Sequence, residues 1–286
     1  MKPNAWPGGM ANALTYDSRM DDAAPPLPDP LDLYRLAVQH PLAEVAFIEH
    51  CWAHYHGEAS EPTLLREDFA GTCAVSAAWV ASDPDRQAMA VEWDEPTAAW
   101  AASRFKDPDL HIVTADVLAI DEPAVDVTLA QNFSVLYHHD RASLLAYLAH
   151  SRCGLNPGGL LIMDLFGGPG VDQPSVQNRR IEPDEAGFEP FDYQWDQRGL
   201  DRVTGRIDCR IHFELHGGRR LQDAFVYDWR LWSPEEIIEL AREAGYTEPA
   251  LWWSDPGRPG RSEPIKAVPE GQNWVGYVVC REPGTP

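Results

Sequence analysis

Carboxylate side chains recur through the first half of the sequence, each at the end of a short apolar segment. Glu67 and Asp68 stand directly before a turn of small residues, Glu92 follows a second apolar segment, and Asp116 ends a third. A carboxylate can accept hydrogen bonds from two neighbouring hydroxyl groups, and it attracts an amine or another positive charge. The pattern therefore favours a ligand that carries hydroxyls and a cation.

Residues 63–79 (TLLREDFAGTCAVSAAW) have the pattern of a strand, a tight turn and the start of a helix. Small residues in such a turn let a ligand approach the backbone, and the N–H groups at a helix N-terminus face that ligand. A phosphate at this position would be repelled by carboxylates beside the turn, and this turn follows two of them. The segment therefore points away from a pyrophosphate.

The next apolar stretch ends in amides and is followed by histidines. Gln131, Asn132 and Phe133 end the stretch, and Tyr137 and His138 come directly after. An asparagine side chain can orient a substrate but cannot act as a base, whereas a histidine can accept a proton near neutral pH. Asn132 and His138 are therefore candidate catalytic residues, and Tyr137 is a candidate substrate contact. The alternative for His138 is a solvated loop histidine.

Strand and helix patterns alternate between residues 63 and 167. After the first strand, we expect strands at 87–93, 110–117, 125–133 and 155–166, with helices at 96–105 and 141–151. Such alternation specifies a parallel sheet with helices on both faces. Because ligands bind at the carboxyl ends of parallel strands, the acids and amides should gather there. We therefore expect an α/β fold with a Rossmann-like, doubly wound, mostly parallel sheet.

The whole chain divides into five parts by composition and pattern. We expect a flexible tail (1–30), an N-terminal helical cap (31–60), a Rossmann-like cofactor-binding core (61–169), an antiparallel substrate-side insertion (170–230) and a return to the core with a late helix and a β-hairpin (231–286). The tail is rich in Pro, Gly, Ala and Asp, which bury little surface. Proline at position 41 should divide the helical cap into two helices.

The insertion contains aromatic residues in alternation with polar ones. Three of its segments read as antiparallel strands joined by glycine turns: 191–195, 206–215 and 221–232. Tyr193, Trp195 and Trp229 are candidate walls of a substrate pocket, and their faces would suit an amine or a cation. The alternative is that these rings form only the core of a small added sheet.

Composition limits the kind of partner. The 286 residues carry 45 acidic against 23 basic side chains, a net charge of −22, which opposes binding to nucleic acid. The five cysteines are scattered and the chain has no stretch that could span a bilayer, so we expect a cytoplasmic protein without membrane contact.

His50 and His54 could share a helix face, but no further ligand has suitable spacing, and we expect no metal.

Together these segments resemble the motifs of class I S-adenosylmethionine-dependent methyltransferases of the small-molecule type. The similar segments are EDFAGTC (67–73), VEWD (91–94), TADV (114–117), QNF (131–133) and LNPGGLLIMDLF (155–166). The likeness extends to residues 230–281, with a helix that begins SPEE and a last strand that this family runs antiparallel. Within the first motif only Gly71 matches the usual glycine pattern, because Phe69 and Cys73 stand where glycines are usual.

The resemblance implies S-adenosyl-L-methionine as the cofactor and S-adenosyl-L-homocysteine as its product. Glu67 or Asp68 would hold the methionine amine, Glu92 the ribose and Asp116 the adenine, while Asn132 would lie closest to the methyl group. The full set of implied cofactor contacts is Glu67, Asp68, Phe69, Ala70, Gly71, Thr72, Glu92, Trp93, Asp116, Val117, Gln131, Asn132 and Phe133, with Tyr34 from the leading helices. The insertion would lie over the active site.

Two other functions stay open at this point. One is a nicotinamide-dependent oxidoreductase on a Rossmann sheet, which the paired acids and the terminal hairpin oppose. The other is a non-catalytic protein that binds S-adenosylmethionine or a partner through the same fold. For the favoured function, in-line methyl transfer to a small-molecule acceptor, the sequence leaves open the acceptor atom, the use of a general base and the oligomeric state.

Overall fold

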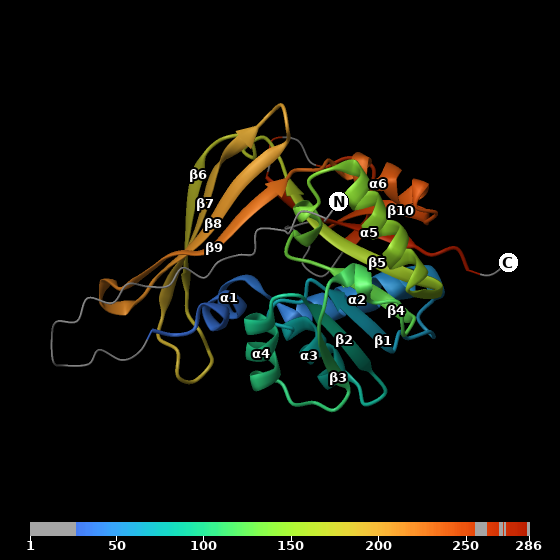
Figure 1. The fold of residues 1–286 in the computed structure, drawn as a ribbon, viewed down its shortest axis with the longest axis horizontal. Helices are drawn as coiled ribbons and strands as arrows, with labels where there is room; N and C mark the ends of the chain where they lie inside the picture. The colour runs from blue at the N-terminus through green and yellow to red at the C-terminus, as the bar shows by residue number, and fades with distance from the viewer. Residues whose placement is uncertain (1–26, 255–261, 269–270, 272, 285–286) are drawn as a thin grey trace, which may run out of the picture.

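The structure is a computed structural model and describes residues 27–254, 262–268, 271 and 273–284 (Figure 1). Nearly all of the expected flexible tail, residues 1–30, lies outside the described residues. The rest of the chain forms a large mixed sheet covered by helices and a smaller antiparallel sheet beside it. None of the helices described here is long and apolar enough to cross a membrane.

The large sheet has the strand order β11-β10-β12-β5-β4-β1-β2-β3. Its strands are β1 (Leu64–Asp68), β2 (Gln87–Glu92), β3 (Leu110–Thr114), β4 (Val125–Ala130), β5 (Leu155–Gly167), β10 (Thr247–Ser254), β11 (Ser262–Ile265) and β12 (Trp274–Arg281). The first five pair in parallel, whereas β12 pairs antiparallel with both β5 and β10. This arrangement confirms the expected doubly wound sheet with an antiparallel last strand, and strand β11 is an addition that we did not predict.

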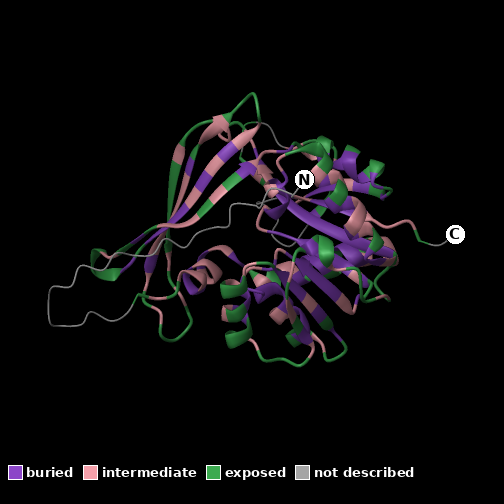
Figure 2. Ribbon diagram, viewed as in Figure 1, coloured by how far each residue is buried: buried purple, intermediate pink, exposed green. Residues whose placement is uncertain are grey.

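Helices cover both faces of this sheet because its strands bury side chains on both sides. The covering helices are α2 (Pro41–His56), α3 (Ala74–Ser82), α4 (Glu95–Arg104), α5 (Arg141–Cys153) and α6 (Pro234–Glu243), whereas α1 (Pro30–Val38) packs on the small sheet. On β5, Leu160 and Ile162 belong to the core under α2, α3 and α4, whereas Leu161 and Met163 belong to the core under α5 and α6. Figure 2 shows the resulting continuous buried layer through the central strands.

Local sequence signals set the helix ends as expected. Proline occupies a first-turn position of α1, α2, α4 and α6, where its missing N–H costs nothing. Helix α6 begins with a full capping box between Ser233 and Glu236. Two expected strands end earlier than predicted, β3 at Thr114 and β4 at Ala130, because short 3-10 helices η1 (Val117–Ala119) and η2 (Ser134–Tyr137) follow their turns.

The small sheet confirms the predicted antiparallel insertion and adds one strand to it. It contains β6 (Ser175–Ile181), β7 (Phe191–Asp201), β8 (Arg206–Glu214) and β9 (Arg220–Arg230), in that order, with the short helix η3 (His216–Gly218) before β9. One face packs on α1, where Leu33 meets Phe191 and Phe213. Strand β6 was not predicted because this exposed edge strand lacks an apolar alternation.

A buried ion pair ties β1 to the helical layer that contains α5. The Arg66 guanidinium donates to Asp68 Oδ1 at 2.6 Å and to the carbonyl oxygens of Val117 and Ile120. Tyr147 of α5 donates its hydroxyl to Asp68 Oδ2 at 3.0 Å. Arg66 and Asp68 are both almost fully buried, so neither charge has water as an alternative partner.

We predict that Arg66→Leu lowers the free energy of unfolding by about 3–5 kcal/mol, because it leaves the Asp68 carboxylate buried without its cation. Urea denaturation measures this loss. Arg180→Leu is the matched control, since Arg180 pairs with Glu182 and Asp192 on the exposed surface and should cost about 1 kcal/mol or less. Equal losses for the two variants would contradict the prediction.

Candidate functional site

Two tight turns lie side by side at the carboxyl ends of β1 and β4, where the strand order reverses. In the first turn Phe69, Gly71 and Cys73 have φ values of 55°, 53° and 58°. In the second, Asn132 and Phe133 have φ values of 57° and 62°. Positive φ strains a residue other than glycine, and such strain concentrates at functional sites. Ligands bind at this switch point in doubly wound sheets, so we locate the site here.

Asp164, from the carboxyl end of β5, holds the second turn. Its Oδ1 accepts from the Phe133 N–H at 2.7 Å and its Oδ2 accepts from the Asn132 N–H at 3.0 Å. The residue is 8% exposed, and its burial raises its pKa to about 8. We did not single out Asp164 from the sequence, although an acid inside a continuous apolar run was the available signal.

The two adjacent acids of the first motif have different surroundings. Glu67 is 3% exposed, and its Oε2 accepts from the Ser76 N–H at 2.9 Å and from the Ser76 hydroxyl at 2.5 Å. Burial raises the Glu67 pKa to about 7. Asp68 points to the opposite face, into its pair with Arg66 and its bond with Tyr147. The structure therefore brings Glu67, but not Asp68, to the turn and the start of α3.

Glu92 joins the end of β2 to the first turn. Its Oε2 accepts from the Gly71 N–H at 2.8 Å and its Oε1 accepts from the Asp94 N–H at 2.8 Å. It is 7% exposed, and burial raises its pKa. Trp93 beside it is 55% exposed, and Asp116 is exposed at the start of η1. Glu92 at the end of β2 and Asp116 just after β3 thus lie at the same sheet edge as the two turns.

The N-terminal helices reach the same edge through two polar residues that the sequence analysis missed. The Thr72 hydroxyl donates to Gln39 Oε1, and the Gln131 amide donates to Glu44 Oε2. Tyr277 of β12 also donates to Glu44 Oε1 at 3.2 Å. Burial raises the pKa of Glu44. The helical cap is therefore attached to both turns of the site.

The site collects four shielded carboxyl groups: Glu44, Glu67, Glu92 and Asp164. In the described part of the chain none of them forms an ion pair with lysine or arginine, and their hydrogen-bond donors are neutral groups. Glu44 raises the pKa of both Glu67 and Asp164, and Glu92 raises that of Glu67. These described acids, with the histidines and cysteines, form no group of three placed to hold a metal ion. The arrangement attracts a positively charged ligand.

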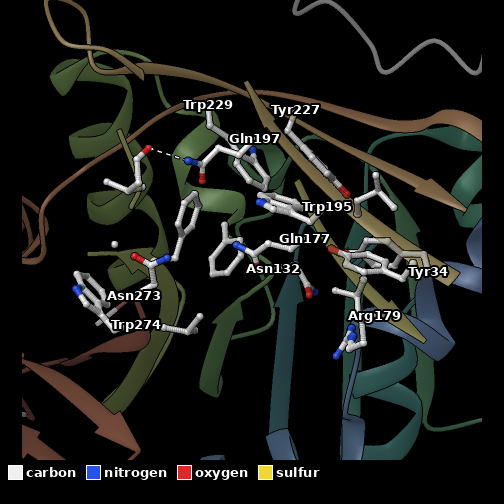
Figure 3. A pocket seen from close by; sticks show the side chains of 18 of the residues that line it. Tyr34, Asn132, Gln177, Arg179, Trp195, Gln197, Tyr227, Trp229, Asn273 and Trp274 are labelled. Carbon is white, nitrogen blue, oxygen red and sulfur yellow. Dashed lines mark hydrogen bonds between the residues drawn. The ribbon is translucent and has the colours of Figure 1, made fainter. Parts of the chain in front are cut away.

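A cavity of about 560 Å³ opens between the second turn and the small sheet. Predicted site residues in its lining are Tyr34, Asn132, Phe133, Tyr193, Trp195 and Trp229 (Figure 3). The rings of Tyr227 and Trp229 stack at 4.4 Å, with that of Trp195 6.0 Å from Trp229. Tyr137 meets the edge of Trp229 at 6.0 Å but is not part of the lining. The cavity is therefore bounded by aromatic rings on its small-sheet side.

His138 lies outside this lining, in a cluster with Phe69 and Tyr147. Its ring stacks on Tyr147 at 5.2 Å, and its Nδ1 is 2.6 Å from the Ser143 hydroxyl. Burial lowers the pKa of His138 to about 4. The structure thus brings Asn132 to the cavity and places the other candidate catalytic residue among buried rings. The role of His138 stays a prediction.

Comparison with solved structures gives matches over nearly the whole chain. An S-adenosylmethionine-dependent methyltransferase from Clostridium acetobutylicum is 14% identical, with a TM-score of 0.66 over 88% of this chain and 97% of that one. The amino pentose methyltransferase CalS10 from Micromonospora echinaspora is 18% identical, with 0.65 over 91% and 99%. The sugar N-methyltransferase KedS8 from Streptoalloteichus is 21% identical, with 0.60 over 94% and 99%. No family model and no curated protein sequence matches the chain.

The fold is therefore that of S-adenosylmethionine-dependent methyltransferases, as the resemblance implied. The agreement includes the mostly parallel sheet, its antiparallel strand β12 and the separate four-stranded sheet.

We predict that Asp164→Ala lowers the free energy of unfolding by about 2 kcal/mol, because two partly buried backbone N–H groups lose their acceptor. Asp164→Asn keeps one acceptor oxygen and should lose less. Urea denaturation of both variants measures the difference, and an alanine variant as stable as the asparagine variant would contradict the assigned role.

Proposed function

We propose that this protein is an S-adenosylmethionine-dependent methyltransferase that acts on a small-molecule acceptor by in-line methyl transfer. The observation that carries the proposal is the group of four shielded carboxyls at the switch point, with no cationic side chain paired to them among the described residues. S-adenosylmethionine brings a sulfonium and an amine, and these charges match the group. The fold shared with methyltransferases supports the same function.

The residues of the sheet edge have distinct roles in this proposal. Glu92 holds the ribose through its carboxylate, and Asp116, beside the buried Val117, faces the adenine. The exposed Trp93 ring covers one side of the nucleoside. The turn from Phe69 to Thr72 accommodates the methionine part. The cofactor supplies the electrophilic methyl group, so the chain mainly has to position the acceptor and exclude water.

The acceptor side of the proposal rests on the cavity. Asn132 lines this cavity together with Tyr34, Tyr193, Trp195 and Trp229. Aromatic rings and amides suit a small amine-bearing molecule with an apolar face. The names of the solved structures CalS10 and KedS8 describe an amino pentose and a sugar N-methyltransferase, and we propose acceptors of that class for this chain.

The composition adds two further elements to the proposal. The net charge of −22 opposes nucleic acid as a partner, which supports a small-molecule acceptor over a nucleic acid. Unpaired cysteines fit a reducing compartment, and we propose that the enzyme works in the cytoplasm. The nicotinamide alternative requires a pyrophosphate beside the first turn, and the Glu67 carboxylate at that turn opposes this charge.

We predict that S-adenosylhomocysteine binds in a calorimetric titration, whereas NADH and NADPH do not. Glu92→Ala should weaken this binding at least tenfold, about 1.4 kcal/mol, because the ribose hydroxyls lose their acceptor. Thermal unfolding of the variant controls for damage to the turn. Binding of a nicotinamide nucleotide in place of the adenosyl ligand would support the oxidoreductase. Cofactor binding without turnover of any small amine would support the non-catalytic alternative.

We predict that affinity for S-adenosylhomocysteine rises between pH 6 and pH 8 and then levels off. At pH 6 the raised pKa values of Glu67 (about 7) and Asp164 (about 8) keep protons on these carboxyls, and the positive charge of a nearby bound amine favours the release of these protons. Calorimetry in phosphate and in Tris buffer measures the released protons. In the free protein these carboxyls favour folding most below pH 4, and that contribution is lost as the pH rises through 7–8. Affinity that does not change with pH would contradict the assignment.

A further inference from the structure

Glu44 lies in the first turn of α2, outside the Rossmann-like core, yet its carboxylate is directed to the end of β4. It accepts from the Gln131 amide and from the Tyr277 hydroxyl, two residues on different strands of the sheet. The residue is half-buried and pairs with no lysine or arginine in the described ranges. A carboxylate that is shielded from water in this way loses hydration free energy. A cationic ligand beside it would offset that loss.

The two acids of the first motif are already engaged in hydrogen bonds within the protein. Glu67 is committed to the start of α3 through two bonds from Ser76, and Asp68 is turned to the other face. Glu44 is close enough to Glu67 and Asp164 to raise the pKa of both. Its hydrogen bond from the Gln131 amide places the carboxylate at the end of β4, directly before the second turn.

We propose that Glu44 binds the amine of the cofactor's methionine part, so that α2 completes a cofactor site begun by the sheet. This inference rests on the proposed function. Gln131 and Tyr277 hold the carboxylate in place, and a carboxylate has about four acceptor positions, which leaves capacity for an ammonium group. The helical cap is thus part of the binding site for the amino acid end of the cofactor, while Glu92 recognises the nucleoside end.

The test compares three adenosyl ligands on wild type and Glu44→Gln by calorimetric titration. The ligands are S-adenosylhomocysteine, its deaminated analogue and 5′-methylthioadenosine, which lacks the whole amino acid part. We expect Glu44→Gln to weaken S-adenosylhomocysteine at least tenfold and to leave 5′-methylthioadenosine within twofold of wild type. In wild type, the deaminated analogue should bind more weakly than S-adenosylhomocysteine. In Glu44→Gln the two ligands should bind equally, as expected if the amine and the Glu44 carboxylate contact each other directly.

The matched control is Glu49→Gln on the same helix, since Glu49 pairs with Arg86 away from the site and should not change any of the three affinities. Normal binding of 5′-methylthioadenosine shows that Glu44→Gln is folded. Equal weakening of all three ligands, or unchanged binding of S-adenosylhomocysteine, would overturn the role of Glu44 and leave the proposed function in place. Failure of wild type to bind any adenosyl ligand would overturn both.

Discussion

The geometry of the site depends on one carboxyl group that holds two consecutive residues in a left-handed conformation. Asn132 and Phe133 follow β4 with positive φ, a conformation that costs each of them about 1–3 kcal/mol. Asp164 offsets this strain because it accepts from both backbone N–H groups. The turn then directs Asn132 into the cavity while Gln131, one residue earlier, reaches Glu44. In the proposed function, the acceptor side and the cofactor side are therefore joined at a single turn.

The alternation of side chains along β1 separates the buried ion pair from the acid that reaches the candidate site. Arg66 and Asp68 point to one face, where they join Tyr147 in the buried network under α5. Glu67 points to the other face and meets the start of α3. Because successive residues of a strand face opposite sides, two adjacent acids cannot serve the same site. Both faces of β1 are buried, so the sequence lacks the alternation of polar and apolar residues that would show which acid faces the ligand.

Most of the fold was predictable because its signals are local and repeated. The alternation of strands and helices predicted the parallel core, and the segment that begins SPEE predicted α6 with its cap. The polar edge strand β6 and the short β11 escaped because neither carries an apolar pattern. Both are held by pairing with a neighbouring strand, and this is information that the segment itself does not contain.

The site was predictable only where its residues follow a strand end. Glu67, Glu92 and Asn132 occupy such positions, and the structure brings them to one sheet edge. Glu44 did not stand out, because an acid in the first turn of a helix has an ordinary explanation in the helix dipole. Asp164 was hidden within an apolar strand. Both are defined by long-range contacts, which only the folded chain reveals.

The distribution of charge between the two sides of the site bears on the proposed chemistry. The carboxyls lie at the sheet edge where we propose that the cofactor binds, whereas the lining of the cavity, as far as the structure describes it, has Arg179 as its one charged residue. A methyl acceptor nitrogen needs a free lone pair, and a carboxylate beside it would keep it protonated. Burial among the rings of Trp195 and Trp229 has the opposite effect and lowers the pKa of an amine. A cavity of this composition therefore favours the nucleophilic form of an amine without a dedicated base, which agrees with the place of His138 outside the lining.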